Sequence, residues 1–196
     1  TEELVERALA WLRRRALPAL LIADVGTGSG AIAIALAQHA PATRLYALEI
    51  SPAACAVAGR NIGRYALGER IALLAGDLLE ALPAAVDLIV ANLPYIAAAD
   101  LATLMPEVGR HEPRLALDGG ADGLSVVRRL LEQAPARLRA GGALFLEIGA
   151  GQGPAARAAA QSAFPQAAIE VHPDLAGHDR IVAIQLPEQA MPCATV

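Results

Sequence analysis

Apolar positions along the chain follow two patterns, one typical of helices and one typical of buried strands. Residues 2–15 place apolar side chains three and four positions apart, which is the spacing of one helix face. Further helical patterns cover residues 30–39, 52–65, 124–139 and a segment from 152 to about 164. Short apolar runs predict strands at 20–25, 44–50, 71–77, 87–92 and 141–149.

Several of these strands are apolar on both faces, which indicates a parallel sheet covered by helices on two sides. The segment 167–187 differs, because it holds two strand-like runs joined by a short turn-rich link. Such a pair predicts a hairpin, so the last strand should run antiparallel to its neighbour. We expect one α/β domain over residues 1–190 and a loose C-terminal tail over residues 191–196.

The composition and charge of the chain exclude several classes of function. The 196 residues are 55% hydrophobic and 3% aromatic, which fits a single domain with an aliphatic core. The net charge is −4 and the 16 basic residues, all Arg, are scattered, so direct nucleic-acid binding is not expected. No apolar run approaches the roughly 18 residues of a membrane span. Cys55 and Cys193 lie far apart, which argues against a zinc site and fits a cytoplasmic location.

The first candidate site is a glycine-rich turn that follows a predicted strand and opens a helix. It comes after Asp24 and contains Gly26, Thr27, Gly28, Ser29 and Gly30. Glycines let the backbone turn tightly and approach a ligand, and a helix amino terminus adds unpaired N–H groups. An ordinary strand-to-helix turn is the alternative interpretation.

Acidic residues end the next two predicted strands. Glu49 stands where a carboxylate can accept hydrogen bonds from both hydroxyls of a ribose, although a solvated strand end is equally compatible. Asp77 could accept from the amino group of an adenine, with Leu78 against the ring, or could simply form a turn. Consecutive strands that end at one edge with polar residues are what a nucleoside site requires.

The fourth candidate is the loop Asn92-Leu93-Pro94-Tyr95, which ends the strand at 87–92. The side-chain oxygen of Asn92 and the carbonyl of Leu93 could each accept one hydrogen of a planar NH₂ group. Pro94 favours an extended conformation at Leu93 and so orients that carbonyl. Tyr95 offers a flat face for stacking. Such a cradle would activate a weakly nucleophilic nitrogen by positioning and electrostatics rather than by a strong base.

Residues that follow this loop have weaker patterns. Glu107, His111 and Glu112 could line a substrate entrance, but surface positions are the more common outcome. Asp118 and Asp122 are typical turn residues within a glycine-rich segment, which could alternatively form a lid.

Several segments together resemble the HemK-type release factor N5-glutamine methyltransferases. They are DVGTGSGAIAIALA, ALEIS, GDLLEAL, DLIVANLPYI, EPRLALDGGADGLSVVRRLL, GGALFLEIGAGQG and PDLAGHDRIVAIQ. The resemblance implies a Rossmann-like class I methyltransferase fold with a seven-stranded, mostly parallel sheet. It also implies S-adenosyl-L-methionine as cofactor, S-adenosyl-L-homocysteine as product, and the GGQ-motif glutamine of class 1 peptide chain release factors as acceptor. Members carry an amino-terminal helical domain that this sequence does not include, so we expect either the catalytic domain alone or a longer protein whose front part is missing from this sequence.

The resemblance also assigns residue roles. The glycine turn would wrap the methionine part of the cofactor, Glu49 the ribose, and Asp77 with Leu78 the adenine, with Asn92 touching both cofactor and substrate. Asn92, Pro94 and Tyr95 would be the catalytic residues, and with Leu93 they would hold the glutamine.

The family usually has proline where this chain has Leu93, and leucine there is similar to the rRNA adenine dimethylases. Four alternatives therefore stay open: a ribosomal-protein glutamine as acceptor, adenine N6-methylation of RNA or DNA, a cofactor-binding scaffold without turnover, and a nicotinamide dehydrogenase. The GxGxG spacing and the NLPY loop both disfavour the dehydrogenase.

Overall fold

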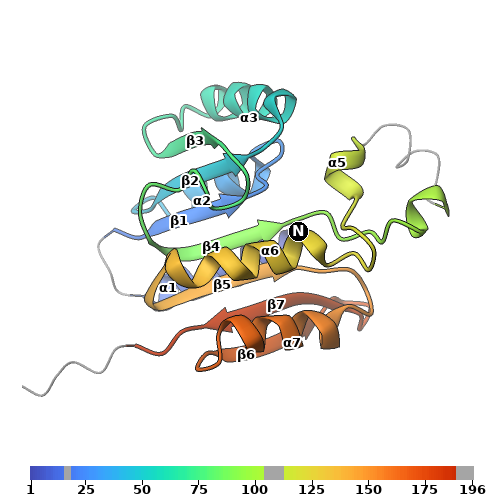
Figure 1. The fold of residues 1–196 in the computed structure, drawn as a ribbon. Helices are drawn as coiled ribbons and strands as arrows, with labels where there is room; N and C mark the ends of the chain where they lie inside the picture. Colours follow the sequence, from blue (N-terminus) through green and yellow to red (C-terminus); the bar gives the residue numbers. More distant parts are fainter. Residues whose placement is uncertain (16–18, 104–112, 189–196) are drawn as a thin grey trace, which may run out of the picture.

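The structure is a computed structural model, and it describes residues 1–15, 19–103 and 113–188. A seven-stranded sheet runs through its centre in the order β3-β2-β1-β4-β5-β7-β6 (Figure 1). The strands are β1 (Leu21–Val25), β2 (Arg44–Glu49), β3 (Ile71–Ala75), β4 (Val86–Asn92), β5 (Leu138–Glu147), β6 (Ala168–Pro173) and β7 (Asp179–Gln185). The strands β1 to β5 are mutually parallel. As predicted, β6 and β7 form an antiparallel hairpin, and β7 is also antiparallel to β5.

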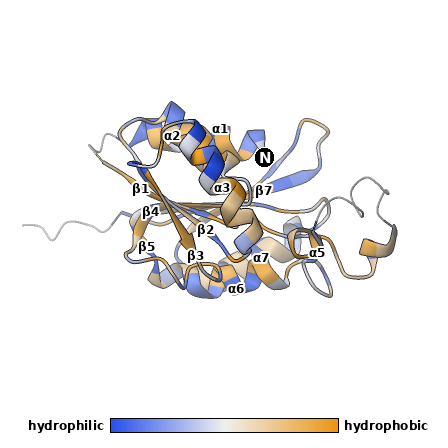
Figure 2. Ribbon diagram, turned by 90° about the horizontal axis from the view of Figure 1, so that it is seen from above, coloured by the Kyte–Doolittle hydropathy of each residue, from blue (hydrophilic) through white to orange (hydrophobic). Residues whose placement is uncertain are grey.

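Helices cover both faces of this sheet, as the apolar runs predict (Figure 2). One face carries α1 (Glu2–Arg14), α2 (Ala31–His39) and α3 (Pro52–Arg64), and the other carries α6 (Ser125–Gln133) and α7 (Gly153–Ala163). Strand β4 shows why the runs are continuous. Leu88 and Val90 pack with the first group of helices, whereas Ile89 and Ala91 pack with the second. Alternate residues of a strand point to opposite faces, so both sets must be apolar.

Local sequence features account for most helix boundaries. Ser51 caps α3 by accepting a hydrogen bond from the Ala54 N–H at 3.3 Å, and Pro52 occupies the first helical position. The expected helix over 124–139 is shorter than predicted. It ends at Gln133, and a 3₁₀ turn, η2 (Ala134–Ala136), contains Pro135, whose ring cannot continue the hydrogen-bond ladder. Strand β5 therefore starts at Leu138, three residues before the predicted boundary.

Two short elements after β4 escaped the sequence pattern, namely η1 (Asp100–Thr103) and α5 (Arg114–Leu117). Figure 1 shows α5 beyond the carboxyl ends of the strands. The predicted tail, 191–196, lies outside the described residues. Within the described ranges no helix is long and apolar enough to cross a membrane, and no group of three or more His, Cys, Asp or Glu side chains could hold a metal ion.

Candidate functional site

The strand order reverses direction between β1 and β4, since β2 and β3 lie on one side of β1 and β4 lies on the other. Open α/β sheets bind ligands in the crevice beyond the carboxyl ends of the strands at such a switch point. A cavity of about 230 Å³ lies there. It is lined by the ends of β1 to β4 and by residues of α5 and α6; the lining residues that the sequence singled out are Gly26, Gly28, Glu49, Asp77, Leu78, Asn92, Leu93, Pro94 and Asp118.

The glycine turn between β1 and α2 has the backbone conformation that glycine allows. Gly26, Gly28 and Gly30 all have positive φ, at 69°, 57° and 84°. A Cβ atom on Gly26 would lie 2.9 Å from the Leu93 side chain, so a substitution here would force the buried Leu93 to shift in addition to straining the backbone. At Gly28 a Cβ atom would meet nothing nearer than 3.9 Å. The Gly28 backbone therefore borders open space in the cavity and is accessible to a ligand.

Other members of the turn support it rather than line the cavity. Thr27 is buried, and its N–H and that of Gly26 donate to the Leu48 carbonyl at 3.0 and 2.9 Å. The Ser29 carbonyl accepts from Asn61 at 2.8 Å. Three of the five turn residues predicted to bind a cofactor, Thr27, Ser29 and Gly30, are thus absent from the cavity lining.

Asp24 holds the turn from beneath, and sequence reasoning assigned it no role. Its side chain is fully buried and accepts hydrogen bonds from the Thr27 hydroxyl at 2.5 Å and the Ala33 N–H at 3.0 Å. Burial raises its pKa to about 6; the two hydrogen bonds lower that pKa, and the nearby charge of Glu49 raises it further. The second carboxylate oxygen, Oδ1, has no hydrogen-bond partner among the described residues. A position before the first glycine, at the end of a buried strand, was the available sequence signal.

Glu49 joins the glycine turn to the start of α3. Its two carboxylate oxygens accept from the Gly28 N–H at 2.8 Å and from the Ser51 N–H at 2.9 Å. The side chain is 8% exposed yet lines the cavity. Each oxygen can accept more than one hydrogen bond, so the carboxylate keeps acceptor capacity for hydroxyls within the cavity.

Asp77 follows β3 and is paired with Arg129 of α6, with 2.5 Å between guanidinium nitrogen and carboxylate oxygen. Arg129 also lines the cavity, and sequence reasoning missed it because the pair spans 52 positions. Leu78 is buried and has a φ of 53°, which is uncommon for a residue with a side chain. The strained backbone at Leu78 places it in the cavity wall beside Asp77.

The loop after β4 brings its first three residues to the same cavity. The Asn92 amide nitrogen donates to the Thr1 hydroxyl at 2.8 Å, which engages the NH₂ group and not the carbonyl oxygen Oδ1. The Leu93 side chain is buried against Gly26, so it packs in the core. Tyr95 is not among the lining residues, and its ring lies near the Cα of Gly149. The predicted stacking role of Tyr95 stays a prediction.

The glycine-rich segment 119–124 is bonded to this loop. Ile96 donates to the Leu117 carbonyl at 3.0 Å, Gly119 donates to the Ile96 carbonyl at 2.8 Å, and Ala98 donates to the Gly120 carbonyl at 2.8 Å. Within the segment, each aspartate side chain accepts from a backbone N–H two residues ahead; the two are Asp118 and Asp122. The predicted turn role of these aspartates is therefore confirmed. Glu107, His111 and Glu112 lie outside the described residues.

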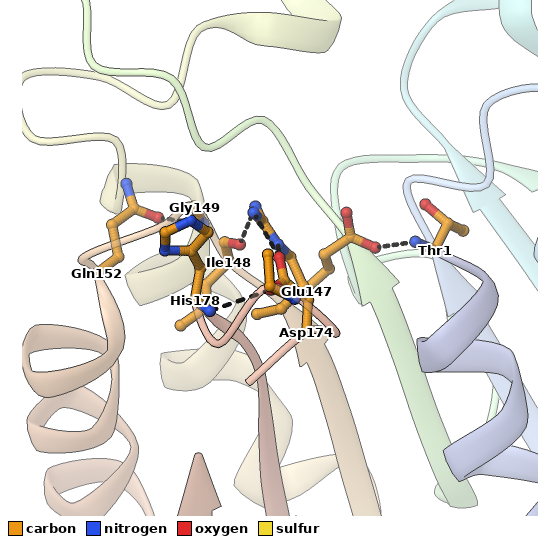
Figure 3. A network of polar contacts seen from close by, with 9 residues as sticks. Thr1, Glu147, Ile148, Gly149, Gln152, Asp174 and His178 are labelled. Carbon is orange, nitrogen blue, oxygen red and sulfur yellow. Dashed lines mark hydrogen bonds and ion pairs between the residues drawn. The ribbon is translucent and has the colours of Figure 1, made fainter. Parts of the chain in front are cut away.

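The strand next to β4 contributes a further polar network at the same edge (Figure 3). Glu147 ends β5 beside Asn92, and its carboxylate lies 2.9 Å from the amino group of Thr1. Arg180 donates to the Ile148 carbonyl and to Asp174, both at 3.2 Å, and so ties the terminal hairpin to the end of β5.

A mostly parallel sheet of this order, with a glycine turn after β1 and an acid after β2, is the fold of the class I S-adenosylmethionine-dependent methyltransferases. The chain aligns with the release factor-specific protein-(glutamine-N5) methyltransferase of Alicyclobacillus acidocaldarius at 26% identity and a TM-score of 0.58. The alignment covers 95% of this chain and 91% of that one.

Sequence comparisons show which methyltransferases of this class the chain is similar to in sequence. Residues 4–119 match the family model of ribosomal protein L11 methyltransferase (PrmA). The chain is 46% identical to the release factor glutamine methyltransferase of Cereibacter sphaeroides, over 95% of this chain and 65% of that protein. It is 47% identical to the ribosomal protein uL3 glutamine methyltransferase of Bordetella pertussis, over 75% of this chain and 49% of that protein. The chain belongs to the methyltransferase family that the model describes, and it is also a homologue of the release factor glutamine methyltransferases.

The comparisons name different acceptors, and they match different parts of the chain. The match to the family model ends at residue 119, so it covers the glycine turn and the loop 92–95 but stops at the start of the glycine-rich segment, which is bonded to Ile96 and Ala98 just after that loop. The glutamine methyltransferase relatives match most of the chain. The chain spans between 57% and 65% of the length of four curated release factor relatives.

Proposed function

We propose that this chain is the catalytic part of an S-adenosylmethionine-dependent methyltransferase that modifies the side-chain nitrogen of a protein glutamine. The acceptor is the glutamine of the GGQ motif in class 1 release factors. One observation carries the proposal: Asn92, Leu93 and Pro94 line the same cavity as Gly26, Gly28 and Glu49. A nucleoside site and an amide cradle therefore open onto one another.

The cavity suits a nucleoside with a charged tail. Its walls include apolar side chains such as Leu48, Ile50 and Val126. Glu49 and Asp77 supply carboxylate oxygens for hydroxyl and amino groups, and the Gly28 backbone borders open space. S-adenosylmethionine, when bound, supplies an electrophilic methyl group and leaves as S-adenosylhomocysteine.

The chain's own residues act on the acceptor nitrogen. The Asn92 Oδ1 atom and the Leu93 carbonyl would each accept one hydrogen bond from the glutamine NH₂ group. Two acceptors increase electron density on the nitrogen and fix the direction of its attack, which is a positioning and electrostatic effect. Pro94 restricts Leu93 to extended conformations and so holds that carbonyl in place. The proton leaves the methylated amide for water.

Mass spectrometry tests the acceptor. The protein is incubated with S-adenosylmethionine and an intact class 1 release factor, and we expect one added methyl group on the GGQ peptide. Asn92→Ala should abolish most of this transfer, whereas Gln161→Ala, which removes a carboxamide bonded to Pro165 away from the cavity, should leave it largely intact. Equal transfer by wild type and Asn92→Ala would refute the cradle.

Labelled cofactor distinguishes the alternatives. Transfer to RNA or DNA with no label on the release factor would indicate adenine N6-methylation by the same cradle. Cofactor binding in a calorimeter without transfer to any acceptor would indicate a scaffold. Label on a ribosomal protein and not on the release factor would indicate a different acceptor protein with the same glutamine chemistry.

A further inference from the structure

Gln152 lies in the connection between β5 and α7, and its side chain points back toward the edge of the sheet at which the cavity lies. It occupies the N-cap position of α7, yet its side chain makes no capping hydrogen bond with that helix. Figure 3 shows the side-chain carboxamide turned toward Gly149. Because the usual local role of an N-cap side chain is not fulfilled here, its bonds elsewhere need a separate explanation.

The Gln152 carboxamide connects three segments that are far apart in the sequence. Its oxygen accepts from the Gly149 N–H at 2.8 Å. Its nitrogen donates to the Tyr95 carbonyl at 2.8 Å and to the Asp122 carbonyl at 3.3 Å. A single side chain therefore bonds the end of β5, the loop after β4 and the glycine-rich segment.

Two glycines pack directly against this carboxamide. A Cβ atom on Gly123, whose φ is 77°, would collide with the Tyr95 carbonyl oxygen and with the Gln152 amide nitrogen. A Cβ atom on Gly149 would lie 3.0 Å from the Gln152 oxygen and 3.2 Å from the Tyr95 ring. Only glycine at these positions lets three loops approach closely enough to share one carboxamide.

We propose that Gln152 is a positioning residue for methyl transfer, which holds the main chain of the cradle through the Tyr95 carbonyl. This inference rests on the proposed function, because it assigns the cradle its substrate. The Tyr95 carbonyl is separated from the Leu93 carbonyl by only two residues, one of which is Pro94. With φ of Pro94 restricted by its ring, a fixed Tyr95 leaves the Leu93 carbonyl few other orientations.

Loss of this anchor should lower the rate rather than cofactor affinity. A displacement of about 1 Å in a positioned reacting group can cost about 10²-fold in rate. Gln152 is absent from the cavity lining, whereas Gly28 and Glu49, two of the predicted cofactor contacts, lie on the other side of the switch point. We therefore expect kcat to fall by about 10- to 100-fold while the Kd for S-adenosylmethionine changes less than about twofold.

The test uses two variants and a matched control. Gln152→Glu keeps the acceptor for the Gly149 N–H but replaces the donor to Tyr95, and Gln152→Leu removes both. Gln161→Glu makes the same chemical change on the same helix, where the Gln161 amide donates to the Pro165 carbonyl at 3.1 Å away from the site. Both Gln152 variants should lose kcat with cofactor affinity retained, and Gln161→Glu should behave as wild type.

Amide hydrogen exchange on the free protein tests the anchor independently of any substrate. The Ile96 N–H should exchange faster in both Gln152 variants, because the loop that contains Tyr95 and Ile96 loses its hydrogen bond to the Gln152 side chain. The Gly149 N–H should exchange faster in Gln152→Leu but stay protected in Gln152→Glu, since only the latter keeps an acceptor. Wild-type exchange at Ile96 in both variants would overturn the proposal.

The two proposals fail in different ways. A wild-type protein that leaves release factor unmodified would refute the proposed function, and the exchange rates would still decide whether Gln152 anchors the loop. Active wild type with Gln152 variants within twofold in kcat would refute the positioning role alone. A loss of kcat matched by an equal loss of cofactor affinity would also refute it.

Discussion

The buried carboxyl of Asp24 makes a prediction about pH that can be worked out from its surroundings. The group is enclosed beneath the glycine turn, and burial raises its pKa from the ordinary value of 3.8 to about 6. Asp24→Asn removes the titration and keeps a side-chain oxygen that can accept from Thr27 or Ala33. The amide nitrogen of the new side chain adds an offset to the stability, but that offset does not vary with pH.

The sign follows from proton binding. Between pH 3.8 and about 6 the folded protein holds a proton on Asp24 that the unfolded chain has lost, so this group makes the folded state less stable as pH rises. Above both pKa values the ionised carboxylate costs about 3 kcal/mol. Roughly half of this cost is present at pH 5, so the other half, about 1–2 kcal/mol, develops between pH 5 and pH 8.

Urea unfolding at pH 5, 6, 7 and 8 without cofactor measures the effect. The stability of Asp24→Asn minus that of wild type should increase by about 1–2 kcal/mol from pH 5 to pH 8. Asp122→Asn is the matched control, because hydrogen bonds from Arg128 and Leu124 lower the pKa of that carboxyl to about 2. Its difference from wild type should be constant over this range. A difference for Asp24→Asn that is flat or decreases with pH would show that the carboxyl is not held in its protonated form by burial.

Two further substitutions separate packing from ligand contact. In urea titrations, Gly26→Ala should lower the free energy of unfolding more than Gly28→Ala does. Both substitutions add about 1–2 kcal/mol of backbone strain, but only the new Cβ atom at position 26 contacts Leu93 closely. Equal losses of stability would contradict the packing argument. Arg129→Met should shift the urea midpoint little, since the ion pair with Asp77 is partly exposed, yet raise the calorimetric Kd for S-adenosylmethionine by about three- to tenfold. An unchanged Kd would show that Arg129 does not orient Asp77 for cofactor binding.

The fold was predictable because its determinants are local and repeated along the chain. Continuous apolar runs such as Leu88–Ala91 indicate a strand that is buried on both faces. Strands that alternate with helices along the chain are compatible with only a few sheet topologies. The boundary errors have an equally local cause. The pattern after residue 124 continues to look helical past Pro135, and only the geometry of the proline shows that the chain has already turned toward β5.

The candidate site was predictable only where a residue type follows a strand end. Glu49, Asp77 and Asn92 were found this way, because parallel strands bring their carboxyl ends to one edge. Arg129 and Gln152 were missed, since their partners lie 52 and 57 positions away in the chain. Nothing in a local pattern states which long-range partner a side chain will contact.

Leu93 shows how the two halves of the site depend on each other. The resembled family usually has proline at this position, which would restrict the backbone of the cradle by its ring. Here the leucine side chain is buried beside Gly26, where any larger residue would collide with it. Packing against the glycine turn therefore provides a restraint that ring geometry would otherwise provide, and the main-chain carbonyl that is proposed to accept the amide hydrogen is retained. A change at Gly26 should consequently disturb the acceptor cradle as well as the cofactor turn, although the two follow different strands.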